Sequence, residues 1–351
     1  MNQALNDVSV VIATYNGEKY IVKQLESIRN QTRKPDEVII VDDRSNDNTF
    51  EIVKEYIQQY ALRNWRIYLN DCNLGYKGNF QKGIELATGK YIFLCDQDDE
   101  WERNKIELMT QVMSDNPQIQ ALNCGVRLID GNSEEIEYRA SKNKYNCGFL
   151  YSEQPIGKIS YYSYPYLLKH NISPGCTMAI TQKLRLDFLD TYKCELPHDW
   201  HLNLLASVDF GCAFYNKPLV NYRRHSNNVI GANTGFIKGI TSRTKQHRIQ
   251  GCEEKEKASN AILTYYSRKN GGGTKQLDVT LHADEIEEVL KWNALYKNFF
   301  ADPSLTKLID LYKLSEYRET TRVQIRMWNV VVALKLDDIV IKLVTQKKKG
   351  K

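Results

Sequence analysis

The stretch YIFLCDQDDE, residues 91–100, decides the fold expected for this chain. An apolar, aromatic run that stops abruptly in aspartates is typical of a buried strand ending at a polar crevice. Asp96 and Asp98 are alternate residues, so in an extended chain their side chains share a face and their carboxylates repel unless a cation lies between them. Oxygen ligands favour Mg²⁺ or Mn²⁺, usually shared with substrate phosphates. The alternative is structural: an aspartate-rich cap for a helix over residues 101–113.

Strand-like and helix-like segments alternate before this stretch. Apolar runs at 8–13, 37–41, 65–69 and 91–95 predict strands, and helical spacing fills 20–30, 47–60 and 79–87, with Asp47 as the N-cap of the second helix. Further strands are expected at 126–129, 208–215 and 219–222, and residues 173–180 suit a tight turn into a buried strand. The pattern predicts an α/β fold with a mixed, mainly parallel sheet flanked by helices.

Polar residues follow several of these strands directly. Tyr15, Asp42, Asp43 and residues 73–77 and 96–98 all come just after a strand. Ligands of such sheets bind beyond the carboxyl ends of the strands, so these residues are expected to share one site. Turn formation explains each of them alone, but explains their common placement less well. Neither G-x-G-x-x-G nor G-K-[ST] is present, so a metal and side chains must hold any phosphate.

Composition limits the class of protein. The chain has 351 residues, 26% of them charged, and a net charge of +5 with acidic and basic residues interspersed, which argues against nucleic-acid binding. Its eight cysteines are scattered without a C-x-x-C pair, which favours reduced thiols and a cytoplasmic location. The first residues lead into a strand without a signal peptide, and no apolar run approaches the ~20 residues needed to span a bilayer.

The ordered motifs resemble the family-2 inverting glycosyltransferases with the GT-A fold, most of all bacterial rhamnosyltransferase-type enzymes of surface polysaccharide synthesis. The resemblance covers about the first two-thirds of the chain. It is carried by residues 8–16, 41–47, 73–75, 89–92 and 96–99.

The resemblance implies a role for each matching residue. Ala13, Tyr15 and Asp43 match positions that hold the base and ribose of a nucleotide, and Lys77 and Asn79 lie in the segment that completes this pocket. Within Asp-Gln-Asp, Asp98 is expected to contact the metal, Asp96 the metal and the ribose or sugar, and Gln97 the nucleotide sugar. The implied cofactor is Mn²⁺ or Mg²⁺.

Two later motifs complete the expected site. Asp199 matches the position of the catalytic base, which takes the proton of the acceptor hydroxyl; a helix N-cap role is compatible with this. Residues 223–228, RRHSNN, concentrate cations that could neutralise a diphosphate. Arg224 is assigned to the nucleotide-sugar site and His225 to the metal, with an exposed loop as the alternative. Residues 173–180 are expected to border the sugar and acceptor or to serve packing, and residues 130–154 to form an excursion or an acceptor-facing flap.

A composition shift near residue 235 divides the chain. Residues 1–234 are expected to form the GT-A domain, with a nucleotide-binding half up to about residue 100 and an acceptor half from 101 to 234. Residues 235–351 are expected to form a helical domain. Its Trp328, Val330–Val332 and Leu334, with the lysine-rich tail at 347–351, make either a surface for anionic lipid on the inner face of the plasma membrane or an ordinary core with a solvated tail.

The predicted function is therefore transfer of a sugar from a nucleoside diphosphate, UDP or dTDP above all, to a hydroxyl of a growing bacterial surface glycan. The acceptor is open and includes one linked to polyprenyl diphosphate, and a homo-oligomer is also compatible with the sequence. The alternatives are an inactive nucleotide-sugar- or glycan-binding protein and a sugar-1-phosphate nucleotidyltransferase. The latter lacks support because the glycine-rich N-terminal loop of that class is missing.

Overall fold

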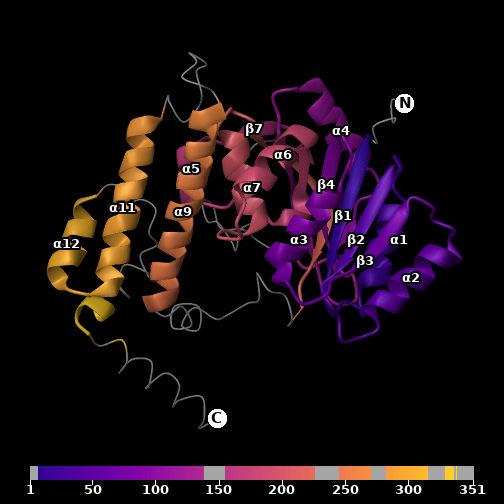
Figure 1. Ribbon diagram of the computed structural model, residues 1–351, viewed down its shortest axis with the longest axis horizontal. Coiled ribbons are helices and arrows are strands. Elements are labelled where there is room, and N and C mark those ends of the chain that lie inside the picture. The colour runs from indigo at the N-terminus through magenta and orange to yellow at the C-terminus, as the bar shows by residue number, and fades with distance from the viewer. Residues whose placement is uncertain are drawn as a thin grey trace, which may run out of the picture. The chain divides into compact units, whose positions relative to one another are not determined.

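The computed structural model describes residues 7–137, 155–225, 245–269, 282–314, 329–335 and 337. Contacts divide these residues into two compact units, one up to residue 225 and one from residue 245 onward. The first unit is built on a single sheet of order β3-β2-β1-β4-β8-β6-β9-β5, with β7 beside β9. Figure 1 shows β1, β2, β3 and β4 side by side in this sheet. The expected mixed α/β fold is confirmed.

The elements of the first unit follow one another along the chain. The strands are β1 (Val8–Thr14), β2 (Glu37–Asp42), β3 (Trp65–Leu69), β4 (Tyr91–Asp96), β5 (Glu100–Trp101), β6 (Ala121–Ile129), β7 (Ile159–Tyr161), β8 (Met178–Thr181) and β9 (Cys212–Arg223). The helices are α1 (Ile21–Arg29), α2 (Thr49–Gln59), α3 (Gly75–Leu86), α4 (Lys105–Asp115), α5 (Tyr164–Lys169), the 3₁₀ turn η1 (Gly175–Thr177), α6 (Gln182–Thr191) and α7 (His198–Ser207).

Strand register brings the polar strand ends to one edge of the sheet. The four strands β3, β2, β1 and β4 are parallel, and Asp42 pairs with Thr14 on one side and Leu69 on the other. On the far side of β1, Ala13 pairs with Asp96. Parallel neighbours end together, so the loops after all four strands emerge side by side. From β8 onward the sheet is mixed: β8 runs antiparallel to both β4 and β6, whereas β6 and β9 are parallel.

Alternation along the strands supplies both faces of the core. Val8, Val10 and Ile12 of β1 join one hydrophobic cluster with buried residues of α1, α2 and α4. The intervening Val11 points to the other face, where α3 packs against β1. Gly83 permits this approach, because a Cβ there would lie 2.4 Å from Cγ1 of Val11. The sheet is thus covered closely on both sides, which fixes the ends of its strands.

The second half of the sheet differs from the sequence expectation. The two strands expected at 208–215 and 219–222 are one strand, β9, while residues 208–211 form a turn after α7. Opposite Gly125 of β6, β9 carries extra residues between its paired positions Tyr215, Pro218 and Val220, and pairing resumes on the far side of this irregularity. A Cβ on Gly125 would lie 3.1 Å from the Lys217 carbonyl oxygen, so the glycine accommodates this close approach.

Helix starts also differ from those expected. The second helix begins at Thr49 with Asn48 as N-cap, and Asp47 instead accepts a hydrogen bond from the Thr49 amide at 3.0 Å. The third begins at Gly75, where φ is +70°, four residues before its expected start. Helix α7 begins at His198 after Pro197, so Asp199 lies inside its first turn. The N-cap interpretation of Asp199 is therefore wrong.

The second unit is helical in its described residues. It contains α9 (Lys245–Lys269), α11 (Ala283–Ala301) and α12 (Leu305–Lys313), with a core that includes Phe299, Phe300 and Leu311. In the described helices, no segment combines the length and the apolarity that a membrane crossing requires. Most of the expected 130–154 excursion, Trp328 and the lysine-rich tail lie outside the described residues, and the expected lipid surface stays a prediction.

Candidate active site

The turn after β4 gathers acidic side chains at the sheet edge. Asp96 ends β4, Asp98 is half-buried, and Asp99 is 1% exposed. Burial, followed by the charges of Asp98 and Asp199, raises the pKa of Asp96 to about 7. Burial together with Asp98 and Asp96 raises the pKa of Asp99 well above its ordinary value. Each carboxylate therefore makes ionisation of its neighbours harder, as expected where a cation belongs.

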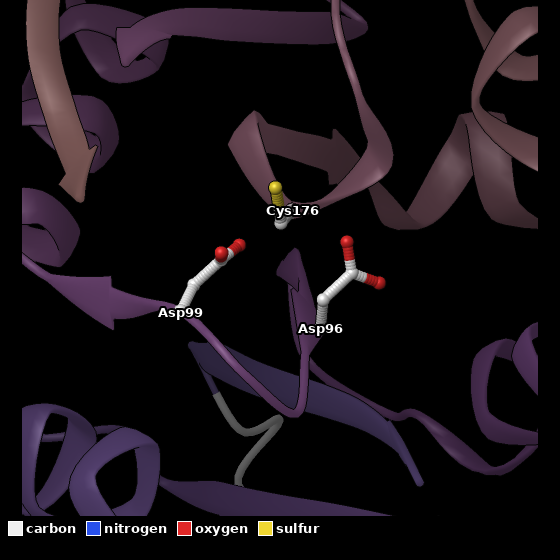
Figure 2. A group of neighbouring side chains, drawn as sticks. All are labelled: Asp96, Asp99 and Cys176. Carbon is white, nitrogen blue, oxygen red and sulfur yellow. The ribbon is translucent and has the colours of Figure 1, made fainter. Parts of the chain in front are cut away.

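Cys176 of η1 closes this cluster from the opposite side. Asp96, Asp99 and Cys176 each offer one ligand atom within 4.8 Å of the others, and Figure 2 shows their side chains converging from the turn and from η1. Oδ2 of Asp99 is buried and has no hydrogen-bond partner among the residues that the structure describes. Beneath the cluster, the buried ammonium of Lys105 donates to the Cys176 carbonyl at 2.6 Å and lies 3.6 Å from the Trp101 ring centroid. The lysine offsets part of the negative charge and fixes η1.

Asp98, which lies between Asp96 and Asp99 in the turn, pairs with His225. Nε2 of His225 lies 2.7 Å from Oδ2 of Asp98, and their side chains are 17% and 18% exposed. The structure thus brings together two of the three residues expected to bind metal, Asp98 and His225, from segments 127 positions apart. A carboxylate and an imidazole suit Mn²⁺, and the crowded carboxylate of Asp96 adds a further oxygen donor. The residues present fit a divalent cation.

Asp199 lies within electrostatic range of the acidic turn. It is 4% exposed, and its charge contributes to the raised pKa of Asp96. Oδ2 accepts a hydrogen bond from Nδ2 of Asn171 at 2.9 Å, and Oδ1 accepts one from the Trp200 amide at 2.9 Å. Burial raises the pKa of Asp199 to about 6, against the effect of those two hydrogen bonds. A carboxylate with this pKa is a suitable proton acceptor near neutral pH.

The residue before this carboxylate is also buried. His198 is 4% exposed and stacks on Phe80 of α3 with ring centroids 3.9 Å apart. Burial lowers its pKa to about 3, so the imidazole is neutral. Gly175 leaves room for it, since a Cβ there would lie 2.5 Å from Nε2 of His198. The ring thereby packs α7 against both α3 and η1.

Asp43 organises a second part of the site after β2. Its Oδ1 accepts hydrogen bonds from Nδ2 of Asn70 at 2.8 Å and from the Leu74 amide at 2.7 Å, and the side chain is buried. Nδ2 of Asn73 donates to the Asp43 carbonyl at 3.2 Å. The loop after β3 is therefore fastened to Asp43, and it carries the exposed side chains of Leu74 and Tyr76.

Gln97 fastens the loop after β1. Its Oε1 accepts from the Tyr15 amide at 2.8 Å, and its Nε2 donates to the Tyr15 carbonyl at 2.9 Å. A Cβ on Gly17 would lie 2.2 Å from Gln97 Oε1, which explains the glycine. The Tyr15 side chain stays 43% exposed and available to stack on a ring. The expected direct contact of Gln97 with a nucleotide sugar stays a prediction.

The remaining expected nucleotide residues occupy the same edge but make their described polar contacts within the protein. Asn79 is buried, donates to the Val41 carbonyl at 2.9 Å and accepts from Asn70 at 3.0 Å. Lys77 donates to the carbonyls of Cys194 and Glu195 at 3.1 and 2.6 Å. Ala13 lies half-buried near the end of β1, and the Arg224 amide donates to the Ile129 carbonyl at 2.8 Å. Their ligand contacts stay predictions.

Comparison with known proteins decides the family. A family model described as glycosyl transferase family 2 matches residues 9–184, half of the chain and all of the acidic turn. The chain belongs to that family.

Relatives of this glycosyl transferase family 2 chain include sugar transferases. It is 27% identical over 237 residues to the dTDP-rhamnosyl transferase RfbG of Shigella flexneri, a match that covers 64% of this chain and 75% of that protein. It is 28% identical over 225 residues to an uncharacterised protein of Mycobacterium tuberculosis, covering 63% of this chain and 60% of that one. The match with the mycobacterial protein thus spans less than two-thirds of that relative's length.

Two solved structures share the fold of this family member. Residues 1–349 of Staphylococcus aureus TarS in complex with UDP-GlcNAc are 16% identical with a TM-score of 0.51, covering 90% of this chain and 93% of that one. GalNAc-T7 with UDP, GalNAc and Mn²⁺ is also 16% identical, with a TM-score of 0.54, covering 89% of this chain and 59% of that one. At these identities the likeness establishes the GT-A fold alone.

Three residues of this family-2 site escaped the sequence interpretation. Asn171 binds Asp199 from outside any expected motif, and no local signal marks it. Lys105 appeared to be an ordinary helix residue, yet it is fully buried beneath the cluster. Arg223 was grouped with cations that face a diphosphate, but its side chain is 0% exposed, so that assignment is wrong. Burial of this kind arises only from tertiary packing.

Proposed function

We propose that this family-2 protein is an inverting, metal-dependent glycosyltransferase. It transfers a sugar from a nucleoside diphosphate to a hydroxyl group of a growing bacterial surface glycan. The observation that carries this proposal is Asp199: a buried carboxylate with a pKa of about 6, facing the acidic turn after β4 from another element. The RfbG relative supports a dTDP sugar as donor, and the fold shared with TarS supports a UDP sugar.

Asp199 acts as the general base in a single displacement. The acceptor hydroxyl gives its proton to the Asp199 carboxylate while its oxygen forms the bond to C1 of the donor sugar. The bond from C1 to the diphosphate oxygen breaks, and the nucleoside diphosphate leaves with the electron pair. Because attack comes from the face opposite the leaving group, the configuration at C1 is inverted. Asn171 holds the carboxylate in place through its 2.9 Å hydrogen bond.

Asp98 and His225 would hold the divalent cation, with Asp96 beside them. A bound Mn²⁺ or Mg²⁺ stabilises negative charge on the departing diphosphate. The GalNAc-T7 structure with Mn²⁺ supports this choice of cofactor. Tyr15 stacks on the base, and Asp43 shapes its pocket through the contacts with Asn70 and Leu74.

Nucleotide binding tests the proposal directly. With Mn²⁺ present, one of UDP, dTDP and GDP is expected to raise the melting temperature, since a ligand at 100 times its Kd stabilises by about 2.7 kcal/mol. Asp43→Ala is expected to weaken that nucleotide at least ~10-fold, because hydrogen bonds to a charged group contribute about 1.5–3 kcal/mol. Differential scanning fluorimetry measures both effects.

The matched control for this experiment is Asp71→Asn, an exposed acid in the loop after β3 that Asp43 fastens. It should bind the nucleotide like the original protein. If no nucleoside diphosphate stabilises the protein in Mn²⁺, the proposed donor is wrong. Equal loss in both variants would remove Asp43 from the pocket.

Turnover should also depend on the ionisation of Asp199. The base acts only when deprotonated and its pKa is about 6, so kcat/KM is expected to rise with pH and level off above about pH 7. Below the pKa it should fall about tenfold per pH unit. A pH–rate profile from pH 5 to 8 at saturating Mn²⁺ measures this limb. A kcat/KM that does not change over that range would contradict the assignment of Asp199 as the base. If the pH at which kcat/KM falls shifts with the Mn²⁺ concentration, the titrating group would be Asp96.

A further inference from the structure

We infer that Arg223 is a positioning residue that holds the metal-binding pair Asp98 and His225 in register. The inference rests on the proposed function, because it concerns the cation that this pair would bind. Arg223 is the last residue of β9, and the pair lies on either side of it in space: Asp98 in the turn after β4, and His225 two residues further along the chain.

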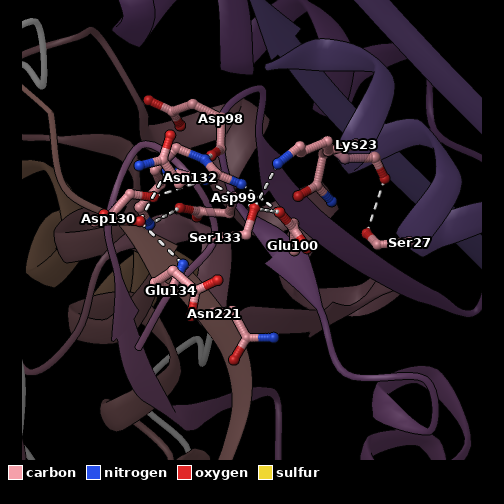
Figure 3. A network of polar contacts seen from close by, with 12 residues as sticks. Lys23, Ser27, Asp98, Asp99, Glu100, Asp130, Asn132, Ser133, Glu134 and Asn221 are labelled. Carbon is pink, nitrogen blue, oxygen red and sulfur yellow. Dashed lines mark hydrogen bonds and ion pairs between the residues drawn. The ribbon is translucent and has the colours of Figure 1, made fainter. Parts of the chain in front are cut away.

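The guanidinium of Arg223 connects two separate segments. Nε donates to the Asp98 carbonyl at 2.8 Å, Nη1 donates to the Asp130 carbonyl at 2.7 Å and to Ser133 Oγ at 3.1 Å, and Nη2 donates to the Glu100 carboxylate. These contacts join the acidic turn to the loop after β6. Figure 3 shows Asp98, Glu100, Asp130 and Ser133 gathered in this polar network.

The backbone of the same residue holds the other side of the turn. The Arg223 amide donates to Oδ1 of Asp99 at 2.9 Å, and the Arg223 side chain donates to the Asp98 carbonyl. Arg223 therefore binds two successive aspartates. The direction of the Asp98 side chain is set by the peptide units on both sides of it. Arg223 fixes the unit that follows Asp98 through the Asp98 carbonyl, and it holds the side chain of the next residue, Asp99.

His225 is fixed through an aromatic neighbour. The ring of Tyr20, just before α1, lies 4.7 Å from the guanidinium carbon of Arg223 and 5.1 Å from the imidazole of His225. The Tyr20 ring thus contacts both the arginine and the histidine expected to bind metal. With Nε2 of His225 2.7 Å from Asp98, and Arg223 bound to the Asp98 carbonyl, these four residues form a closed ring of contacts.

Only an arginine can make these contacts together. The guanidinium side chain is 0% exposed and keeps its charge in a buried setting, compensated by Glu100. Ser133 Oγ also donates to Glu100 at 2.6 Å, which orients that carboxylate. A lysine keeps the charge but has no planar fork, so it cannot span the Asp98, Asp130 and Glu100 acceptors at once. Loss of a supporting hydrogen bond of this type typically costs 10–100-fold in metal affinity.

The test is Mn²⁺ binding by Arg223→Lys in the full chain, measured from the free-ion signal in electron paramagnetic resonance without nucleotide. We expect the Kd for Mn²⁺ to rise about 10–100-fold. Turnover should fall at limiting Mn²⁺ and recover at high Mn²⁺, which a merely structural defect would not do. The matched control is Arg127→Lys, an arginine on the adjacent strand β6 that pairs with Glu102 at 2.6 Å, and it should leave the Kd unchanged.

The outcomes separate this inference from the proposed function. A wild-type Kd in Arg223→Lys, or equal weakening in both lysine variants, overturns the positioning role while leaving the glycosyltransferase proposal intact. If the unaltered protein binds no Mn²⁺, the metal proposal itself fails and the inference fails with it. Should Arg223→Lys not fold, Ser133→Ala decides: it removes one guanidinium contact, and an unchanged Kd in that variant overturns the inference.

Discussion

Asp199→Asn is expected to lower turnover by about 10²–10⁴-fold while leaving nucleoside diphosphate binding nearly unchanged. General base catalysis is typically worth that factor, and an amide cannot accept the proton of the acceptor hydroxyl. The asparagine keeps the shape of the side chain and an oxygen that can accept from Asn171. Single-turnover transfer assays and nucleotide titrations on the same preparation measure the two effects.

The melting temperature of the Asp199→Asn variant distinguishes a catalytic base from a residue that only supports the fold of α7. The pKa of Asp199 is about 6 in the fold against 3.8 ordinarily, so its protonated form is favoured there. Its stabilising effect is fully present below pH 3.8 and is lost as the pH rises through about 6. At pH 7.5 the Asp199→Asn variant should therefore melt at or above the temperature of the unaltered protein. An inactive variant that also unfolds earlier would favour a structural role.

A neighbouring buried acid provides the control for this variant. Asp187 of α6 is 2% exposed and stands outside the acidic cluster. Asp187→Asn is expected to lose stability but to keep its turnover per folded molecule. If Asp187→Asn and Asp199→Asn lose activity equally, the loss comes from replacing a buried acid in this part of the protein and not from losing the proton acceptor.

The sequence predicts those parts of the site that follow directly from strand ends. Asp43, Asp96 and Asp98 come immediately after apolar runs, and parallel pairing places the ends of neighbouring strands together, so their common edge could be foreseen. The ordered motifs also indicate pairs of site residues that lie far apart in the sequence. Asp98 and His225 are both expected at the metal, and their side chains are in contact.

Residues whose role depends on burial could not be predicted in this way. Lys105 and Arg223 carry charges that are ordinarily exposed, and only the packing of α4 and β9 against the acidic turn makes them internal. Asn79 is expected to contact a ligand from its matching position, and the structure adds a supporting role that the sequence did not indicate: its amide joins the ends of β1 and β2. A linear pattern does not distinguish a side chain that faces a ligand from one that supports the loop beside it.

Asp96→Asn is expected to raise the melting temperature of the metal-free protein at pH 8 by several degrees. Burial and two neighbouring carboxylates raise the pKa of Asp96 to about 7 from 3.8. The stabilising effect of this group is fully present below pH 3.8 and is lost as the pH rises through about 7, so the ionised form weakens the fold at pH 8. Three pKa units correspond to at most about 4 kcal/mol, and each kcal/mol shifts the midpoint by about 2–4 °C in a domain of this size.

In Mn²⁺ the unaltered protein should have a higher melting temperature than Asp96→Asn, the reverse of the order expected without metal. A cation stabilises the ionised carboxylates, so the unaltered protein gains melting temperature in Mn²⁺ whereas Asp96→Asn gains less. The test is a set of thermal melts at pH 5 and pH 8, each in chelator and in Mn²⁺. In chelator, the difference in melting temperature between the two proteins should be smaller at pH 5 than at pH 8. The exposed Asp115 at the end of α4 supplies the control, since Asp115→Asn should change the midpoint by no more than about 1 °C in any of these conditions. The contrary result is an Asp96→Asn variant that melts at a lower temperature than the unaltered protein at pH 8 in chelator. It would show that hydrogen bonds stabilise the acidic turn and that charge repulsion does not weaken it. The argument for a cation between these carboxylates would then fail.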